Sequence, residues 1–139
     1  MVDDTMRDVG WFSAETDEPV DEAIETVTAA LKEEGFGILT RIDLDEAFDE
    51  KLGVEFRPYA ILGACNPKLA YEAVQRAPEI GLFLPCNVTV EQREGGGSTI
   101  RLTDPEAMLA SALSEGDRRL EGVAADARAR IERVAAALS

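Results

Sequence analysis

Two short motifs in the middle of the chain contain both of its cysteines and could carry chemistry. Cys65 belongs to a Cys-Asn-Pro motif, and Cys86 belongs to a Pro-Cys-Asn motif. Each motif adjoins a short apolar run, so we expect each thiol at the end of a helix or strand. If the motifs meet in the fold, they form a candidate pocket from Cys65, Asn66, Pro67, Pro85, Cys86 and Asn87.

The two thiols have three interpretations, and the sequence leaves all three open. In the first, both cysteines pack in the core as small hydrophobic residues. In the second, Cys65 precedes a helix N-terminus, whose partial positive charge lowers the thiol pKa. Cys65 and Cys86 would then cycle redox or bind a soft metal such as Cu(I). In the third, the thiols and Asn side chains line a pocket for a small molecule of unknown identity, without chemistry at sulfur.

Several classes of enzyme are disfavoured by what the chain lacks. It has no histidine, which removes the usual general base and the usual ligand of catalytic zinc. It has no G-x-S-x-G element, and no glycine-rich phosphate loop follows its first predicted strand. Catalysis by carboxylates stays open, but no pair stands out among the 28 Asp and Glu residues. The sequence therefore favours a protein without catalytic activity.

Local signals predict the elements that would position the two motifs. The apolar run 60–65 has the length of a strand, and Asn66 followed by Pro67 is typical of a helix start. Pro78 is expected to end that helix. Val88 alternates with polar neighbours, as in a half-buried strand. Each cysteine is thereby placed at an element end.

The whole pattern predicts an α+β fold. We expect strands near 6–15, 36–42, 60–65, 88–94 and 99–103, and helices near 19–34, 43–52, 67–77, 105–113 and 117–138. A glycine-rich turn at 95–98 joins two strands as a hairpin, so the sheet is at least partly antiparallel. We therefore predict a single domain over 1–139, a two-layer sandwich with one mostly antiparallel sheet packed by helices. Trp11 is expected in the core or at a dimer interface.

The composition is strongly acidic. The chain has 14 basic and 28 acidic residues, which give a formal net charge of −14. This balance disfavours nucleic acid and anionic membranes as partners. The lysine-poor, acidic composition favours a halophilic source, and an acidic protein from a GC-rich genome is the alternative. We see no signal peptide and no membrane span, so we expect free thiols in a reducing cytoplasm.

Charged residues suggest three further expectations. Arg57 is the one cation close in sequence to the strand that ends in Cys65, and it either meets an anionic ligand or is simply exposed. The carboxylates of 43–50 resemble a calcium loop, but the required glycine and closing glutamate are missing, so we expect a solvated helix face. The last helix has an alanine-rich stripe, which we expect to dock on the sheet or on a second subunit.

The chain resembles a known family at the two cysteine motifs. The segments concerned are Gly63-Ala64-Cys65-Asn66-Pro67 with Leu69-Ala70, and Gly81-Leu82-Phe83-Leu84-Pro85-Cys86-Asn87-Val88. They are similar to the hallmark of the family called domain of unknown function 302. The resemblance covers about Thr16 to Asp104, a family-like core (16–104) that is followed by a C-terminal helical extension (105–139). It implies a small α+β domain with one antiparallel sheet, often a homodimer, and it implies no activity.

Two hypotheses for function follow. The first is a small non-catalytic binding or interaction module, a homodimer with a pocket at Cys65-Asn66 and Cys86-Asn87. The second is a thiol-dependent protein that uses Cys65 and Cys86 either for redox chemistry or for binding Cu(I).

Overall fold

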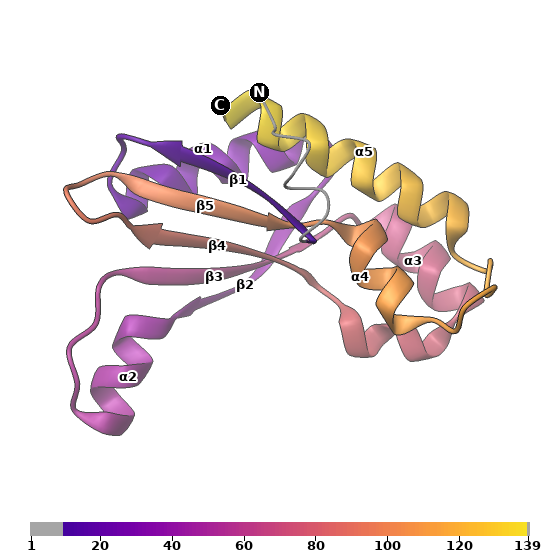
Figure 1. Ribbon diagram of the computed structural model, residues 1–139, viewed down its shortest axis with the longest axis horizontal. Helices are drawn as coiled ribbons and strands as arrows, with labels where there is room; N and C mark the ends of the chain where they lie inside the picture. The colour runs from indigo at the N-terminus through magenta and orange to yellow at the C-terminus, as the bar shows by residue number, and fades with distance from the viewer. Residues whose placement is uncertain (1–9, 139) are drawn as a thin grey trace.

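The computed structural model describes residues 10–138 and contains a five-stranded sheet with helices packed against it (Figure 1). The strands are β1 (Trp11–Thr16), β2 (Gly37–Asp43), β3 (Tyr59–Cys65), β4 (Cys86–Gln92) and β5 (Ser98–Thr103). The helices are α1 (Val20–Glu33), α2 (Leu44–Leu52), α3 (Pro67–Arg76), the 3₁₀ helix η2 (Pro78–Phe83), α4 (Pro105–Ala112) and α5 (Glu121–Leu138). The sheet order is β1-β5-β4-β3-β2 with every pairing antiparallel, which confirms the predicted α+β fold.

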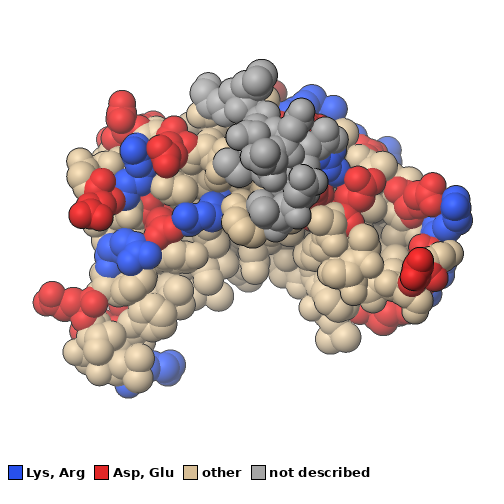
Figure 2. Space-filling view, viewed as in Figure 1, with Lys and Arg blue, Asp and Glu red and all other residues tan. Residues whose placement is uncertain are grey.

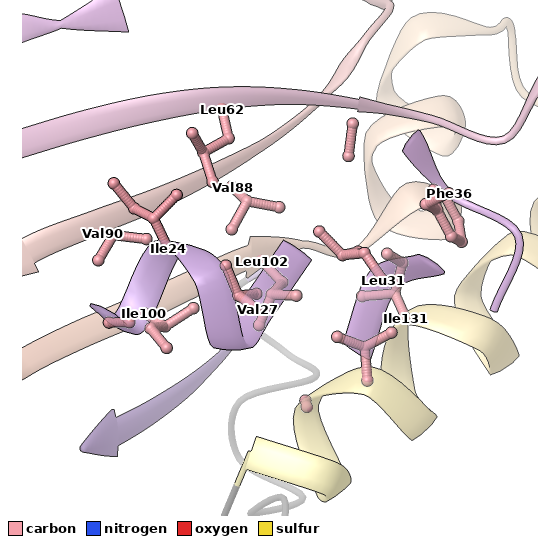
Figure 3. Close-up of a cluster of buried hydrophobic side chains, with 14 of the residues drawn as sticks. Ile24, Val27, Leu31, Phe36, Leu62, Val88, Val90, Ile100, Leu102 and Ile131 are labelled. Carbon is pink, nitrogen blue, oxygen red and sulfur yellow. The ribbon is translucent and has the colours of Figure 1, made fainter. Parts of the chain in front are cut away.

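The main hydrophobic core lies between one face of the sheet and the helices α1 and α5. Every second residue of the central strands points into it, because side chains alternate between the two faces of a strand. Figure 3 shows its members, which include Ile24, Val27, Leu31, Phe36, Leu62, Val88, Val90, Ile100, Leu102 and Ile131. Full burial of one such side chain contributes about 1.5–3 kcal/mol to the free energy of folding. This core holds α1 and α5 on the same face of the sheet.

α1 begins and ends where the sequence predicts. Pro19 precedes the helix in an extended conformation, and Val27 and Leu31 belong to its buried stripe. Gly35 follows the helix with φ of 86°, a left-handed conformation that glycine adopts without strain. The chain then turns into β2. The end of α1 at Glu34 thereby comes to lie beside the start of α3.

A second apolar cluster fills the opposite end of the molecule, between α3, η2, α4 and the first half of α5. Its members include Leu69, Ala73, Ile80, Leu109, Leu120, Val123 and Ala127. α5 belongs to both clusters, because Ile131 and Val134 in its second half pack in the main core. The predicted alanine-rich stripe is therefore buried on the sheet and on α4, although α5 begins at Glu121 rather than at 117.

Besides α5, the strands β1 and β4 differ from the sequence prediction in their bounds, and α2 differs in its burial. β4 runs from Cys86 to Gln92 rather than over 88–94. β1 runs from Trp11 to Thr16 rather than over 6–15, and residues 6–9 lie outside the described part of the chain. α2 forms as predicted, but none of its residues is buried. Its Phe48 packs edge-on against Phe56, with ring centroids 5.3 Å apart, so the apolar residues of α2 contact a loop rather than the core.

The face of the sheet opposite α1 and α5 is called the open face here. Two adjacent rows of side chains cross it at its centre, and each row follows the strand register. One row is Ser13, Arg101, Thr89, Ile61 and Ile42, and the next is Trp11, Thr103, Asn87, Gly63 and Thr40. Trp11 is 42% exposed and Ile42 is 51% exposed. Figure 2 shows an uncharged stretch of surface between the lobe of α2 and the lobe that contains α4.

Candidate functional site

The two cysteine motifs meet at one end of the β3–β4 pair, as the sequence prediction requires. Cys65 is the last residue of β3 and Cys86 is the first residue of β4. Four of the six candidate pocket residues line a common cavity: Cys65, Asn66, Pro85 and Cys86. Pro67 and Asn87 are exposed and lie outside its lining.

The cavity beside the cysteines is small and apolar. Its walls come from the second apolar cluster and include Leu69, Ile80, Leu109 and Val123. Its volume is about 40 Å³. Pockets that hold small organic ligands have volumes of roughly 300–1,000 Å³. The cavity is therefore a packing defect between the sheet and the helices, with room for only a few atoms.

The Asn66 side chain is used in holding helices together. Its Oδ1 accepts a hydrogen bond from the backbone N–H of Leu69 at 3.2 Å, so it caps α3 as predicted. Its Nδ2 donates to the backbone carbonyl of Glu34 at 3.3 Å, at the end of α1. A Cβ at Gly35 would lie 2.9 Å from the same Nδ2, so the glycine allows this close approach. Asn66 is therefore a structural tie between α1 and α3.

Cys86 and Asn87 point to opposite faces of the sheet. In the β3–β4 pair, Cys86 lies opposite Ala64, and both are buried on the helix-covered face. Asn87 lies opposite Gly63 in the row that crosses the open face. Its backbone carbonyl accepts a hydrogen bond from Thr103 Oγ1 at 2.7 Å. Asn87 is thus excluded from the cavity because successive side chains of a strand alternate in direction. Pro67 is excluded as an exposed residue at the start of α3.

The predicted lowering of the Cys65 pKa is wrong. Burial raises the pKa of the Cys65 thiol. Burial, together with the neighbouring Cys65, raises the pKa of the Cys86 thiol from its ordinary value of 9.0 to about 11. Both cysteines are free. The apolar walls of the cavity disfavour the charged thiolate form.

Two features are absent from the part of the chain that the structure describes: a cluster of three possible metal ligands and a membrane-spanning helix. Within residues 10–138, no three His, Cys, Asp or Glu side chains come together in a way that could hold a metal ion. No helix in the same range is both long enough and apolar enough to cross a bilayer. The predicted two-thiol Cu(I) site is a smaller arrangement and stays a hypothesis.

The open face is a second candidate site, and most of it escaped the sequence analysis. Trp11 was expected in the core or at an interface, and the structure exposes it beside Ser13 and Thr103. Asn87 lies two strands away in the same row as Trp11. The signal that could have identified this face is the alternation of side chains along β4. Val88 and Val90 are core residues, so Asn87, one position earlier, must point to the other face of the sheet.

Comparisons with other proteins agree with the family resemblance and extend it. The family described as "Domain of unknown function DUF302" matches residues 12–138, which include α4 and α5. The resemblance in the sequence had ended near Asp104. The crystal structure of an uncharacterized conserved protein DUF302 from Bacillus stearothermophilus is 30% identical to this chain. The match covers 93% of this chain and 98% of the other, with a TM-score of 0.80. A search of curated proteins found no match. The chain therefore belongs to the DUF302 family.

Proposed function

We propose that the protein is a non-catalytic interaction module that forms a homodimer through its open face. One observation carries this proposal. The two central rows of the open face contain ten residues, and Arg101 is the only charged one among them. Charged residues make up 30% of the whole chain. A surface so poor in charge on so acidic a chain is suited to contact with another protein.

The residue types on this face support the same proposal. The cores of protein interfaces are depleted in charged residues and enriched in aromatic ones. Trp11 and Ile42 supply exposed apolar area, while Thr40 and Asn87 supply hydrogen-bonding groups at the surface. A second copy presents the same residues, and a two-fold axis pairs one patch with itself. Two chains of charge −14 repel each other, and contact through two rows of residues that contain a single charged side chain adds little to this repulsion.

A thiol-dependent function is the second candidate, and one observation favours it. Cys65 and Cys86 line the same cavity, so a soft metal ion or an oxidant that entered it would meet both thiols. The raised pKa values of both thiols oppose this function, because the thiolate is the metal ligand and the nucleophile. A small-molecule function for the cavity is opposed by its volume of about 40 Å³. The two free thiols agree with a cytoplasmic location, which we also propose.

The dimer proposal is tested by sedimentation equilibrium on wild type and on a pair of matched variants. Ile42→Glu places a charge on the edge strand β2, at the end of one central row of the open face. Val74→Glu places the same charge on an exposed site of α3, where Val74 is 41% exposed. We expect wild type and Val74→Glu to be dimers and Ile42→Glu to be a monomer with an unchanged circular dichroism spectrum. A monomeric wild type at about 100 µM protein and about 2 M NaCl would contradict the proposal.

The single tryptophan provides an independent readout of the same interface. Trp11 is the only tryptophan of the chain, and it lies on the open face. Association at this face removes its ring from water, so the fluorescence emission maximum should move to longer wavelength when the wild-type protein is diluted. Ile42→Glu should show the long-wavelength maximum at every concentration. A dimer whose emission does not change on dilution would show that association uses another surface.

A further inference from the structure

Three arginines from separate elements line one hollow at the hairpin end of the open face. Arg57 precedes β3, Arg93 follows β4, and Arg101 lies in β5. The other lining residues are Glu15, Glu91, Gln92, Glu94 and Thr99. The volume of this arginine hollow is about 590 Å³, within the range of small-molecule sites. Figure 2 shows basic and acidic side chains interspersed over this side of the molecule, on the left.

Glu91 holds two of these arginines in fixed positions. Its Oε2 accepts a hydrogen bond from Arg57 Nε at 2.8 Å, and its Oε1 accepts one from Arg101. The Glu91 side chain is only 11% exposed. Burial acts to raise the pKa of Glu91, but the hydrogen bonds from Arg101 and Arg57 outweigh it, and the pKa lies below its usual range. The Glu91 carboxylate therefore stays ionised and holds the guanidinium groups of Arg57 and Arg101 in place beside the hollow.

The same two guanidinium groups keep donors for a ligand. Each has several N–H groups, and only some of them face Glu91. The Arg57 side chain is 47% exposed and that of Arg101 is 40% exposed. The Arg57 guanidinium also stacks on the Phe56 ring, 4.3 Å from its centroid, which further restricts its orientation. Two cations share one buried carboxylate, so this pair of arginines presents a net positive charge to the hollow.

Arg93 is the third hydrogen-bond donor of the hollow, and its ion pair with Glu15 is weak. Arg93 lies 3.3 Å from Oε2 of Glu15, whose side chain is 63% exposed. Exposed pairs of this kind contribute about 0–1 kcal/mol, so a bound anion can replace the carboxylate of Glu15 at little cost. The lining of the arginine hollow balances three arginines against the three glutamates Glu15, Glu91 and Glu94. By contrast, the charged residues that line the hollow beside α2 are all acidic: Asp45, Glu46, Asp49 and Glu55.

We propose that the arginine hollow binds a small molecule through a phosphate or carboxylate group, which Arg57 and Arg101 hold and Arg93 completes. Planar guanidinium groups match the geometry of both oxyanions. Gln92 and Thr99 supply uncharged donors for the rest of the ligand. The arginine hollow borders the proposed dimer face, because Arg101 belongs to one of the two central rows of the open face. The other lining residues lie outside these rows, so binding is also measured on a monomeric variant.

The proposal is tested by titrating the protein with inorganic phosphate and, separately, with acetate, while NaCl keeps the ionic strength constant. The readout is the ¹⁵N chemical shift of the arginine Nε groups. We expect a saturable shift at Arg57 and Arg101 with at least one of the two anions, and the anion that saturates identifies the class of ligand. The titration is repeated on Ile42→Glu, whose hollow is intact, so a failure of the dimer proposal does not affect the outcome.

Three variants test whether the anion binds in the arginine hollow rather than elsewhere on the surface. Arg101→Gln should weaken binding about tenfold, the effect of one charge-assisted contact. Arg76→Gln, which removes another exposed arginine that is paired with a carboxylate, should change nothing. Glu15→Gln should strengthen binding about threefold, because it removes the competing partner of Arg93. This last variant carries the test even if Arg101→Gln fails to fold. Absence of saturable shifts with both anions, or unchanged affinity in Glu15→Gln, would overturn the proposal.

Discussion

The Nε atom of Arg128 lies 3.2 Å from Oδ2 of Asp104, and the two side chains are 12% and 4% exposed. The other oxygen of Asp104 accepts hydrogen bonds from the backbone N–H groups of Glu106 and Ala107 at the start of α4. The Arg128 guanidinium also lies 5.3 Å from the centroid of the Phe12 ring in β1. One ion pair thus connects α5, α4 and the edge of the sheet.

Removal of the Asp104 carboxylate should be strongly destabilising. Asp104→Ala leaves the buried Arg128 charge without its nearest partner and removes the cap of α4, so we expect a loss of about 3–5 kcal/mol in unfolding free energy. Asp104→Asn keeps an oxygen for the cap and should lose less. Urea denaturation measures both. Glu72→Gln, which breaks the exposed pair with Arg76, should cost less than about 1 kcal/mol. Equal losses in all three variants would contradict this account.

Gly63 should not tolerate a side chain. A Cβ at this position would lie 2.3 Å from Thr40 Oγ1 and 2.7 Å from Cγ of the Pro85 ring. We expect Gly63→Ala to lower the unfolding free energy by about 1–3 kcal/mol, because the proline ring cannot rotate away. Gly122→Ala is the matched control. Nothing lies within 4 Å of a Cβ at Gly122 in α5, so it should stabilise by up to about 1 kcal/mol. The test fails if Gly63→Ala is as stable as wild type.

Stability should fall at alkaline pH because of Cys86. Its pKa rises from 9.0 to about 11 on folding, so the folded state retains a proton that the unfolded state releases. The stabilisation is complete below pH 9 and is lost as pH rises through about 11. Two pKa units correspond to about 3 kcal/mol. Urea denaturation at several pH values measures this slope, and the difference between wild type and Cys86→Ala removes the contribution of other groups. If the unfolding free energy of Cys86→Ala falls with pH as steeply as that of wild type, Cys86 is not the group responsible for the alkaline loss of stability.

Salt should stabilise the folded chain and its dimer. The net charge of −14 causes repulsion within the folded state and between copies, and salt screens this repulsion. We expect the melting temperature of the monomeric variant Ile42→Glu to rise between about 0.1 M and about 2 M NaCl. The wild-type dimer should also dissociate at lower protein concentration in the higher salt. A melting temperature that falls with NaCl would contradict the proposed adaptation to salt.

The starts and ends of most helices could be predicted from the sequence, because their signals are local, whereas the bounds of β1, β4 and α5 were not predicted correctly. The Asn66-Pro67 and Asp104-Pro105 pairs both start helices, as expected from an N-cap followed by proline. Gly53 ends α2 with φ of 65°. Strand order could not be predicted in the same way. β1 pairs with β5, and nothing within either segment specifies a partner so distant along the chain.

The candidate site was predicted in part for the same reason. Cys65 and Cys86 meet because β3 and β4 pair, which the sequence analysis left open. The pKa of each thiol depends on walls that come from α4 and α5, so it could not be inferred from the motif. The arginine hollow was represented in the sequence by Arg57 alone. Its partners Glu91 and Arg101 approach it only through the register of three strands.

At the start of β4, side chains alternate between the two faces of the sheet, so the adjacent residues Cys86 and Asn87 of the Pro-Cys-Asn motif point in opposite directions. Cys86 serves the interior, whereas Asn87 serves the outer surface. A larger side chain at position 86 would therefore disturb the packing between the sheet and the helices, whereas one at position 87 would change the surface of the open face.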